Sequence, residues 1–399
     1  MNQKPVSERL HELSQFLIRH EKPAAGEPRF ILSPYRICPL GAHVDHQGGP
    51  VLGMTINLYT LLAFQPIEEP VVRLHALNYG ECVELPLQEN HKAASGHWSS
   101  YMVGAIGALC RHYPLKRGII GAVRGDLPGG GLSSSASVGL AYLMALAHAN
   151  HLDISREELV TLDQILENEF LGLQNGILDQ TTILFSRRER LLYIDTLNFR
   201  TELLAPGARR HDFSILIAFS GISRMLTGTG FNQRVQECRQ AAAQLARLAR
   251  RDPVSRLGLL PDSVFEAYGY RLPDSLRRRA AHFFGERRRV FQGRAAWMEG
   301  DLTAFGNLMN ASCRSSISNY ESGSETLKRL WEITAGTAGV LGSRFSGGGY
   351  GGCVIALVET NRREEAVRRI EAAYLHEFPD LRGKAAFFYV EPEDGVRLL

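Results

Sequence analysis

The sequence predicts an α+β protein with two domains. Strands dominate the first 90 residues, helices dominate the second half, and a strand–loop–helix unit surrounds the glycine-rich run at 127–137. A polar segment at 200–212, which contains Pro206 and Gly207, interrupts the apolar pattern. It predicts an N-terminal domain of residues 1–205 and a C-terminal domain of residues 206–399.

The elements of the N-terminal half follow from apolar periodicity and turn residues. We expect a helix over 7–20, strands over 30–33, 55–64, 71–76 and 82–85, a helix over 98–113, a strand over 118–124 and a helix over 138–150. Ser155 and Glu158 have the spacing of a capping box, which predicts a helix from there to about Phe170. A strand over 191–195 ends this half.

The C-terminal half reads mainly as helices. We expect a buried strand over 213–220, helices over 230–251, 274–299, 301–311 and 322–337, and strands over 354–358 and 385–390. Arginines cluster at 247–251, 277–279 and 287–289, and solvated helix faces are the interpretation we favour for them.

Bulk composition narrows the class of protein. The 399 residues are 44% hydrophobic and 22% charged, as in ordinary globular chains, and the net charge of +3 favours neither nucleic acid nor a membrane as partner. The six cysteines lack metal-binding spacing, which predicts buried free thiols in a reducing compartment. With no signal-like or membrane-spanning apolar run, we expect a cytoplasmic protein.

The run Leu-Pro-Gly-Gly-Gly-Leu-Ser-Ser-Ser-Ala-Ser at 127–137 predicts an anion site. Glycines allow positive φ and close approach of a ligand, and the N–H groups of Ser134, Ser135 and Ala136 would be free donors at the start of a helix. The pattern is neither a Walker loop nor a Rossmann turn. The alternative, a flexible linker, is disfavoured because strong apolar elements flank the run.

Three further segments carry chemistry. Segment 33–49 holds Arg36, His43, Asp45, His46 and Gln47, and its glycines and prolines predict a loop whose polar side chains bind sugar hydroxyls. Segment 167–180 contains Glu167 and Asp179; the alternative for Asp179 is a helix cap. Segment 342–353 contains six glycines before a strand, which indicates close approach to a ligand or to another backbone.

Taken in order, these four segments resemble the GHMP small-molecule kinase family, and within it the galactokinase-like branch. The resemblance implies a mixed sheet with helices in the N-terminal domain, a ferredoxin-like α/β C-terminal domain, and an active site in the cleft between them. It implies ATP and Mg²⁺, with Asp179 as catalytic base, Arg36 beside the transferring phosphoryl group, and Ser135 and Glu167 as metal ligands. The implied sugar-binding residues are Ala42, His43, Val44, Asp45, His46, Gln47 and Phe231, and the implied ATP-binding residues are Pro128, Gly129, Gly130, Gly131, Leu132, Ser133, Ser134, Ser135, Ala136 and Ser137.

Ala42 departs from the galactokinase pattern, in which a glutamate that binds the C6 hydroxyl precedes the histidine. Its absence removes a charge that would repel a C6 carboxylate by on the order of 4 kcal/mol at about 4 Å and an effective dielectric of about 20. Phe231 stands in place of a sugar-contacting tyrosine, and His46 could carry positive charge toward a carboxylate. The segment resembles the galacturonokinase form of the signature, which implies phosphorylation of D-galacturonate at its anomeric hydroxyl.

Other functions stay open on the sequence. One is a galactokinase, or another neutral-sugar 1-kinase, that tolerates Ala42, in which a different acidic residue could replace the missing glutamate. Another is a non-catalytic sugar sensor, which the intact Asp179, Arg36, Ser135 and Glu167 disfavour. The expected partners are ATP and a sugar or sugar acid, with the chain a monomer or homodimer. His46 and Arg224 are the candidates for pairing with a substrate carboxylate.

Overall fold

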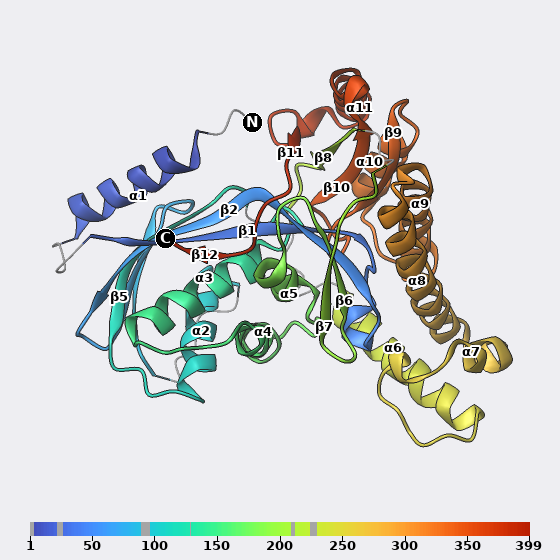
Figure 1. Cartoon of the computed structure of the whole chain (residues 1–399), viewed down its shortest axis with the longest axis horizontal. Coiled ribbons are helices and arrows are strands. Elements are labelled where there is room, and N and C mark those ends of the chain that lie inside the picture. The colour runs from blue at the N-terminus through green and yellow to red at the C-terminus, as the bar shows by residue number, and fades with distance from the viewer. Residues whose placement is uncertain (1–3, 22–26, 89–95, 128, 209–211, 224–229) are drawn as a thin grey trace.

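The computed structural model describes residues 4–21, 27–88, 96–127, 129–208, 212–223 and 230–399. Two β-sheets, each with helices packed on its faces, build the molecule (Figure 1). The predicted α+β class is confirmed.

The first sheet is mixed and contains eight strands among the described residues. Its path runs β12-β1-β2-β5-β3-β4, while β6 pairs with β2 and with β7. β3 and β5 are parallel, and the other pairs are antiparallel. The strands are β1 (Arg29–Leu40), β2 (Val51–Ile67), β3 (Val71–Ala76), β4 (Glu81–Pro86), β5 (Gly118–Gly125), β6 (Leu191–Asp195), β7 (Arg200–Leu204) and β12 (Arg397–Leu398).

Helices cover both faces of this sheet because its long strands alternate apolar side chains toward each face. In β2, Leu62 and Phe64 belong to the core beneath the helices on one face, whereas Leu61 and Ala63 pack with Leu13 on the opposite face. The covering helices are α2 (Ser100–Cys110), α3 (Ser134–Ala149), α4 (Arg156–Ile165) and α5 (Leu178–Phe185) on the first face, and α1 (Val6–His20) on the second.

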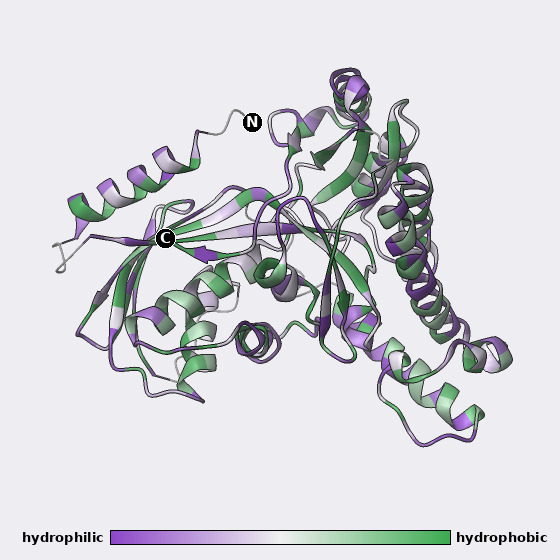
Figure 2. Ribbon diagram, viewed as in Figure 1, coloured by the Kyte–Doolittle hydropathy of each residue, from purple (hydrophilic) through white to green (hydrophobic). Residues whose placement is uncertain are grey.

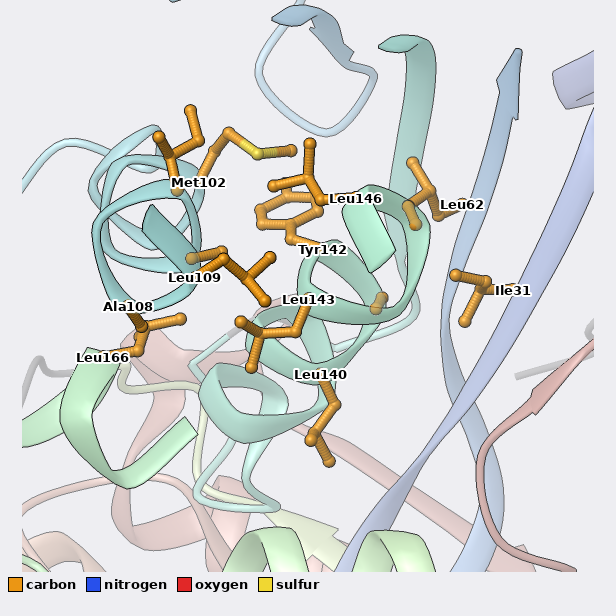
Figure 3. Packing of buried hydrophobic residues seen from close by; sticks show 14 of the residues in the cluster. Ile31, Leu62, Met102, Ala108, Leu109, Leu140, Tyr142, Leu143, Leu146 and Leu166 are labelled. Carbon is orange, nitrogen blue, oxygen red and sulfur yellow. The ribbon is translucent and has the colours of Figure 1, made fainter. Parts of the chain in front are cut away.

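The core beneath α2 and α3 fixes the start of α3, where the glycine-rich run ends. Figure 3 shows Leu140 and Leu143 of α3 in one apolar cluster with Leu109 of α2, with Leu166, which follows α4, and with Ile31 of β1. In Figure 2 the hydrophobic colour runs along α3, whose buried residues lie on most of its circumference. α3 is therefore a rigid element behind the candidate anion site.

The second sheet has four antiparallel strands in the order β11-β8-β10-β9. The strands are β8 (Phe213–Phe219), β9 (Val340–Phe345), β10 (Cys353–Glu359) and β11 (Ala386–Val390). One face packs on α10 (Glu325–Ala335) and α11 (Arg363–Glu377), and the other on α8 (Asp274–Glu299) and α9 (Leu302–Ser318). α6 (Phe231–Leu248) and α7 (Asp262–Tyr268) lie beside the far end of α8 (Figure 1).

A shared core joins the two sheets. It combines Tyr35 and Met54 from the first sheet with Ile217 and Ile355 from the second, together with Phe305 of α9. The end of the chain also crosses back, because β12 pairs with β1 after β11 has paired with β8. A domain boundary at 205/206 stays our prediction, with β12 lying in the first sheet.

Several predicted elements match closely and others were wrong. The strands expected over 71–76 and 191–195 coincide with β3 and β6. The Ser155 side chain accepts a hydrogen bond from the Glu158 N–H, which is one half of a capping box, while the Glu158 carboxylate accepts from the Tyr113 hydroxyl. The pattern missed β7, β9, β12, α5, α7 and α11. Segment 33–49 is not a loop throughout, because β1 continues to Leu40 and pairs with β2 across irregular register at Pro34 and near Pro39.

Two expectations from composition need correction. Arg279 is buried at 1% exposure in ion pairs with Glu237 and Glu321, so the arginine clusters are not simply solvated faces. The cysteines are free, as expected, but Cys82 is exposed. Of the helices that the structure describes, none has the length and apolar character needed to cross a bilayer.

Candidate active site

An ion pair between Arg36 and Asp179 lies at the centre of the candidate site. β1 carries Arg36, and Asp179 is the second residue of α5. Arg36 Nε donates to Asp179 Oδ1 at 2.6 Å, and the two side chains are 5% and 18% exposed. Asp179 is not a helix cap, since Ile177 holds that position. Two residues 143 positions apart are thus brought together as the sequence predicts.

The glycine-rich run forms a tight loop in front of α3. Gly129 and Gly131 have φ values of 72° and 73°, which favour glycine. Ser133 precedes the helix, and the helix begins at Ser134, as needed for free N–H groups at its first turn. The Ser134 hydroxyl accepts a hydrogen bond from the Gly129 N–H at 3.1 Å, which closes the loop on itself.

The glycine-rich segment after β9 packs against this loop. Arg36 Nη1 donates to Gly131 O at 3.4 Å and to Ser346 Oγ at 3.2 Å. A Cβ at Gly347 would lie 2.8 Å from Gly131 O, and one at Gly352 would lie 2.7 Å from Gly130 O. Segment 342–353 therefore makes a close backbone-to-backbone approach, and it brings the second sheet to the site.

A buried acidic pair lies behind the loop. Glu167 is fully buried; its Oε2 accepts from the Asn175 amide, whereas its Oε1 has no partner among the described residues. Burial and the charge of Asp179 raise its pKa to about 7, which the Ser135 side chain partly opposes. Asp163, also fully buried, has no partner for either oxygen, and burial together with Glu167 raises its pKa well above the usual range. Orphaned carboxylate oxygens beside a serine suit an oxygen-seeking cation.

Asp45 lies on the other side of Asp179. It begins the short 3₁₀ helix η1 (Asp45–Gln47), and its Oδ2 accepts from the Leu178 N–H at 3.2 Å. Burial and the charge of Asp179 raise its pKa to about 6. A Cβ at Gly176 would lie 2.5 Å from Asp45 Oδ2, so the glycine of the second motif is needed for this contact.

The turn that contains Ala42 is held from the second half of the chain. Glu286 of α8 accepts from the Gly41 N–H at 2.8 Å and the Ala42 N–H at 3.3 Å, and the His282 ring nitrogen contacts Ala42 O at 2.8 Å. Ala42 is 5% exposed. His43 follows in the left-handed region with φ 58° and stacks on Tyr320 at 4.3 Å between ring centroids.

His46 does not supply the positive charge that the sequence suggested. Burial and the charge of Arg239 lower its pKa to about 3, so it is neutral near neutral pH. Its ring contacts the Tyr320 hydroxyl at 3.1 Å and Gln47 Nε2 at 3.0 Å. Phe231, at the start of α6, lies edge-on to His46 at 6.1 Å.

Some residues named from the sequence turn their side chains into the core. Val44 packs in the cluster with Phe283, and the Gln47 side chain accepts from the Leu257 N–H at 3.3 Å. The side chains of Leu132, Ala136 and Ser137 are also fully buried, and Ser137 Oγ donates to Ser33 O. These positions could meet a ligand only through backbone atoms. Pro128 and Arg224 lie outside the described residues.

A cavity of about 590 Å³ adjoins the site. Its lining includes Asp45, His46 and Gly176 together with the exposed Arg239 and Arg256. Arg239 Nη1 donates to Gln174 Oε1 at 3.2 Å, and no carboxylate pairs with it among the described residues. Arg239 and Arg256, and not His46, bring positive charge to this cavity.

Sequence reasoning missed Ser346, Asp163, Glu286 and Tyr320 as site residues. Ser346 lies in a motif that the sequence singled out only for its glycines. Tyr320 carries no local signal, and Glu286 lies in a segment, 285–288, that matches the family pattern weakly and was given no role. The packing of α8 and α9 against the turn at Ala42 gives both residues their role. Asp163 could have been identified from the sequence, because a carboxylate four residues before Glu167 lies on the same face of a helix.

Family models match two parts of the chain: the GHMP kinases N-terminal domain over residues 100–187 and the GHMP kinases C-terminal domain over residues 294–376. Among curated proteins, a galacturonokinase of Arabidopsis thaliana is 39% identical over 99% of both chains. A galactokinase of Lactococcus lactis is 34% identical over 91% of this chain and 90% of its own.

Solved structures give the same grouping. The structure of Lactococcus lactis galactokinase complexed with galactose has a TM-score of 0.89, with 31% identity over 98% of this chain and 99% of that one. A mevalonate kinase structure, at 19% identity and a TM-score of 0.61, shares the fold. The sequence comparison and the structure comparison thus both find galactokinases or related kinases.

Proposed function

Since this chain belongs to the GHMP kinase family and is an ATP-dependent sugar kinase, we propose that it is a galacturonokinase. It transfers the γ-phosphoryl group of ATP to the anomeric hydroxyl of D-galacturonate and yields α-D-galacturonate 1-phosphate and ADP. The 39% identity with a galacturonokinase over almost the whole chain supports this proposal.

The proposal that the substrate is a sugar acid rests on Ala42. Its methyl group stands where the galactokinase signature has a glutamate, and Glu286 is the acidic residue nearest in the hydrogen-bond network. Glu286 does not replace the missing carboxylate toward a ligand. It is fully buried, and its charge is engaged by Arg289 at 2.6 Å and faces Arg344 at 3.7 Å. A C6 carboxylate would therefore meet no free negative charge from Ala42 or Glu286.

Asp179 and Arg36 perform the transfer in this proposal. Asp179 takes the proton of the anomeric hydroxyl while the anomeric oxygen of the sugar forms a bond to the γ-phosphorus. The bond between the γ-phosphorus and the β,γ-bridging oxygen breaks, and this oxygen leaves with ADP. Each Asp179 oxygen already accepts one hydrogen bond and keeps a lone pair for the proton. Arg36 stabilises charge on the transferring group. General-base help from a positioned carboxylate such as Asp179 is worth about 10²–10⁴-fold.

The loop at 129–135 would hold the ATP phosphates by its backbone N–H groups at the start of α3. Ser135 and Glu167 fit a Mg²⁺ ion, because Glu167 is buried with one unpartnered oxygen and the Ser135 side chain lies close enough to lower the pKa of Glu167. When bound, this metal would neutralise charge on the β- and γ-phosphates.

A galactokinase is the second candidate. The similarity to the Lactococcus lactis enzyme, in sequence and in the galactose-complexed structure, favours it. The two functions differ at one atom group of the substrate, the carboxylate or hydroxymethyl at C5.

The deciding experiment is an ADP-release assay with Mg-ATP and galacturonate, glucuronate, galactose, glucose or N-acetylgalactosamine. We expect kcat/KM for galacturonate to exceed that for galactose. The reverse order would make the chain a galactokinase, and no turnover on any sugar would favour a sensor. Glucuronate tests whether the C4 configuration is read.

Paired variants isolate the charge argument. Ala42→Glu should lower kcat/KM for galacturonate by up to about 1,000-fold, the equivalent of about 4 kcal/mol, and spare galactose. Ala42→Gln is the matched control, since it adds the same bulk to this 5% exposed position without charge. Equal losses in the two variants would mean that size and not charge sets the preference.

A further inference from the structure

Ser133 has an unusual backbone. Its φ and ψ of 59° and 44° lie in the left-handed region, which is unfavourable for a residue with a Cβ. Glycine avoids this penalty, and three glycines already stand at 129–131 of the same loop. A serine is therefore held where a glycine would be easier to accommodate, which points to a task for its side chain.

The Ser133 hydroxyl contacts the carboxylate at the centre of the site. Ser133 Oγ donates to Asp179 Oδ2, while Arg36 Nε donates to Asp179 Oδ1 at 2.6 Å. Ser133 is 6% exposed, so its hydroxyl is largely protected from competing water. One donor on each oxygen fixes the plane of the carboxylate.

The same loop is tied to Arg36 by its backbone. Leu132 O accepts from the Arg36 N–H at 3.1 Å, and Gly131 O accepts from Arg36 Nη1 at 3.4 Å. Ser133, Arg36 and Asp179 thus form one closed unit with the loop. A change in the loop at Ser133 would be transmitted to the orientation of Asp179.

We propose that Ser133 is a positioning residue for Asp179 and not a ligand of the ATP phosphates. Its hydroxyl holds the Asp179 carboxylate in the plane in which a free lone pair faces the anomeric hydroxyl. This inference rests on the proposed function, in which Asp179 is the base. It assigns a second task to the phosphate loop, because one residue of that loop orients the base that deprotonates the sugar.

The two roles of Ser133 predict different kinetics. A phosphate or metal ligand contributes to ATP binding, so its loss raises KM for ATP. A residue that orients the base acts in the chemical step, so its loss lowers kcat and leaves KM for ATP and sugar nearly unchanged.

The test measures kcat and both KM values for Ser133→Ala and Ser133→Gly. We expect kcat to fall about 10- to 100-fold in both variants, as for loss of a hydrogen bond to a charged group, with KM values within about twofold. Ser133→Gly also removes the backbone penalty and keeps the test open if the alanine variant unfolds. Recovery of kcat in Ser133→Gly, or a rise in KM for ATP with unchanged kcat, would overturn the proposal.

Ser134→Ala is the matched control. Ser134 is the next residue, and its hydroxyl accepts from the Gly129 N–H and contributes to the shape of the phosphate loop. We expect this variant to raise KM for ATP. If Ser133→Ala and Ser134→Ala give the same kinetic pattern, Ser133 has no separate role and the proposal is wrong.

Asp179→Asn separates this proposal from the proposed function. It should reduce turnover to a small residual rate while sugar and ATP still bind by equilibrium dialysis, and adding Ser133→Ala should not lower that residual rate further. Retained turnover in Asp179→Asn would refute the base assignment and the role of Ser133 with it. A further loss in the double variant would refute only the role of Ser133.

Discussion

The buried carboxylate of Glu286 offers a quantitative test of how the turn at Ala42 is held. Its Oε1 accepts from the N–H groups of Gly41 and Ala42 and from Ser312 Oγ at 2.6 Å, and its Oε2 accepts from Arg289 Nε at 2.6 Å. The perturbation is Glu286→Gln, which keeps the shape and removes the charge. Both oxygens of Glu286 accept hydrogen bonds, but a glutamine has an NH₂ group in place of one of them. That NH₂ group would face N–H or O–H donors and could not accept from them.

The expected loss of stability follows from the opposing effects of burial and of neighbouring charges on the pKa of Glu286. Burial alone would raise the pKa of Glu286, but the charges of Arg289 and Arg344, the hydrogen bond from Ser312 and, below about pH 4, the charge of His282 outweigh burial and lower it from 4.5 to about 2. That difference corresponds to about 3 kcal/mol of stability. Because the folded-state pKa is depressed, this stability is present above about pH 4.5 and is lost as the pH falls through about 2.

Thermal unfolding at pH 5 to 8 is the assay. Glu286→Gln should lower Tm by about 6–12 °C at every pH in this range, since about 2–4 °C is lost per kcal/mol in domains of this size. KM for the sugar should rise more than KM for ATP, because the variant loosens the turn at Ala42. Glu377→Gln, which breaks the exposed pair with Arg329, is the control and should change Tm by less than about 2 °C.

Two results would refute this reasoning. A Tm change in Glu286→Gln as small as that of Glu377→Gln would mean that the buried network contributes little. A Tm difference that is absent at pH 7 to 8 and appears only toward pH 5 would mean that the charge of Glu286 is not what stabilises the fold at neutral pH.

Three further predictions address other parts of the molecule. Arg9→Ala leaves Asp126 buried without its cation, so it should cost about 3–5 kcal/mol and lower the denaturant midpoint, whereas an unchanged midpoint would show that this buried pair contributes little to stability. Glu167→Gln should raise the Mg²⁺ concentration needed for half-maximal rate at least about 10-fold, and an unchanged Mg²⁺ titration would remove Glu167 from the metal site. Gly131→Ala forces a Cβ to 3.0 Å from Ser346 O at a φ of 73°, so kcat should fall with a lower Tm; wild-type kinetics would contradict a rigid loop at this position.

Local patterns predicted the elements that are decided locally. The strand at 71–76 alternates buried and half-buried residues, and α4 begins at the capping box of Ser155. β1 shows the limit of such patterns. Glycines and prolines suggested a loop, but the apolar side chains of Tyr35 and Ile37 pair with β2 and pack in the core shared by the two sheets. Tertiary packing outweighs turn propensity there.

The sequence predicted which residues form the candidate site, but not the hydrogen bonds that hold them in place. Arg36, Asp179 and Glu167 were named from motif order, and the fold brings them together. The contact of Ser133 with Asp179 could not be read from the sequence, since it depends on a left-handed backbone at a single residue. Glu286 acts on Gly41 across 245 positions, a distance at which no local pattern has information.

The charge of the sugar pocket is set by the fold and not by residue type. Burial lowers the pKa of His43 well below its usual value, that of His46 to about 3 and that of His282 to about 4. All three histidines around Ala42 are therefore neutral near pH 7, although a sequence reader counts them as possible cations. A preference for a sugar acid then cannot rest on them. The features that could support it are the absence of a glutamate at Ala42 and the positive charges of Arg239 and Arg256, which line the adjoining cavity.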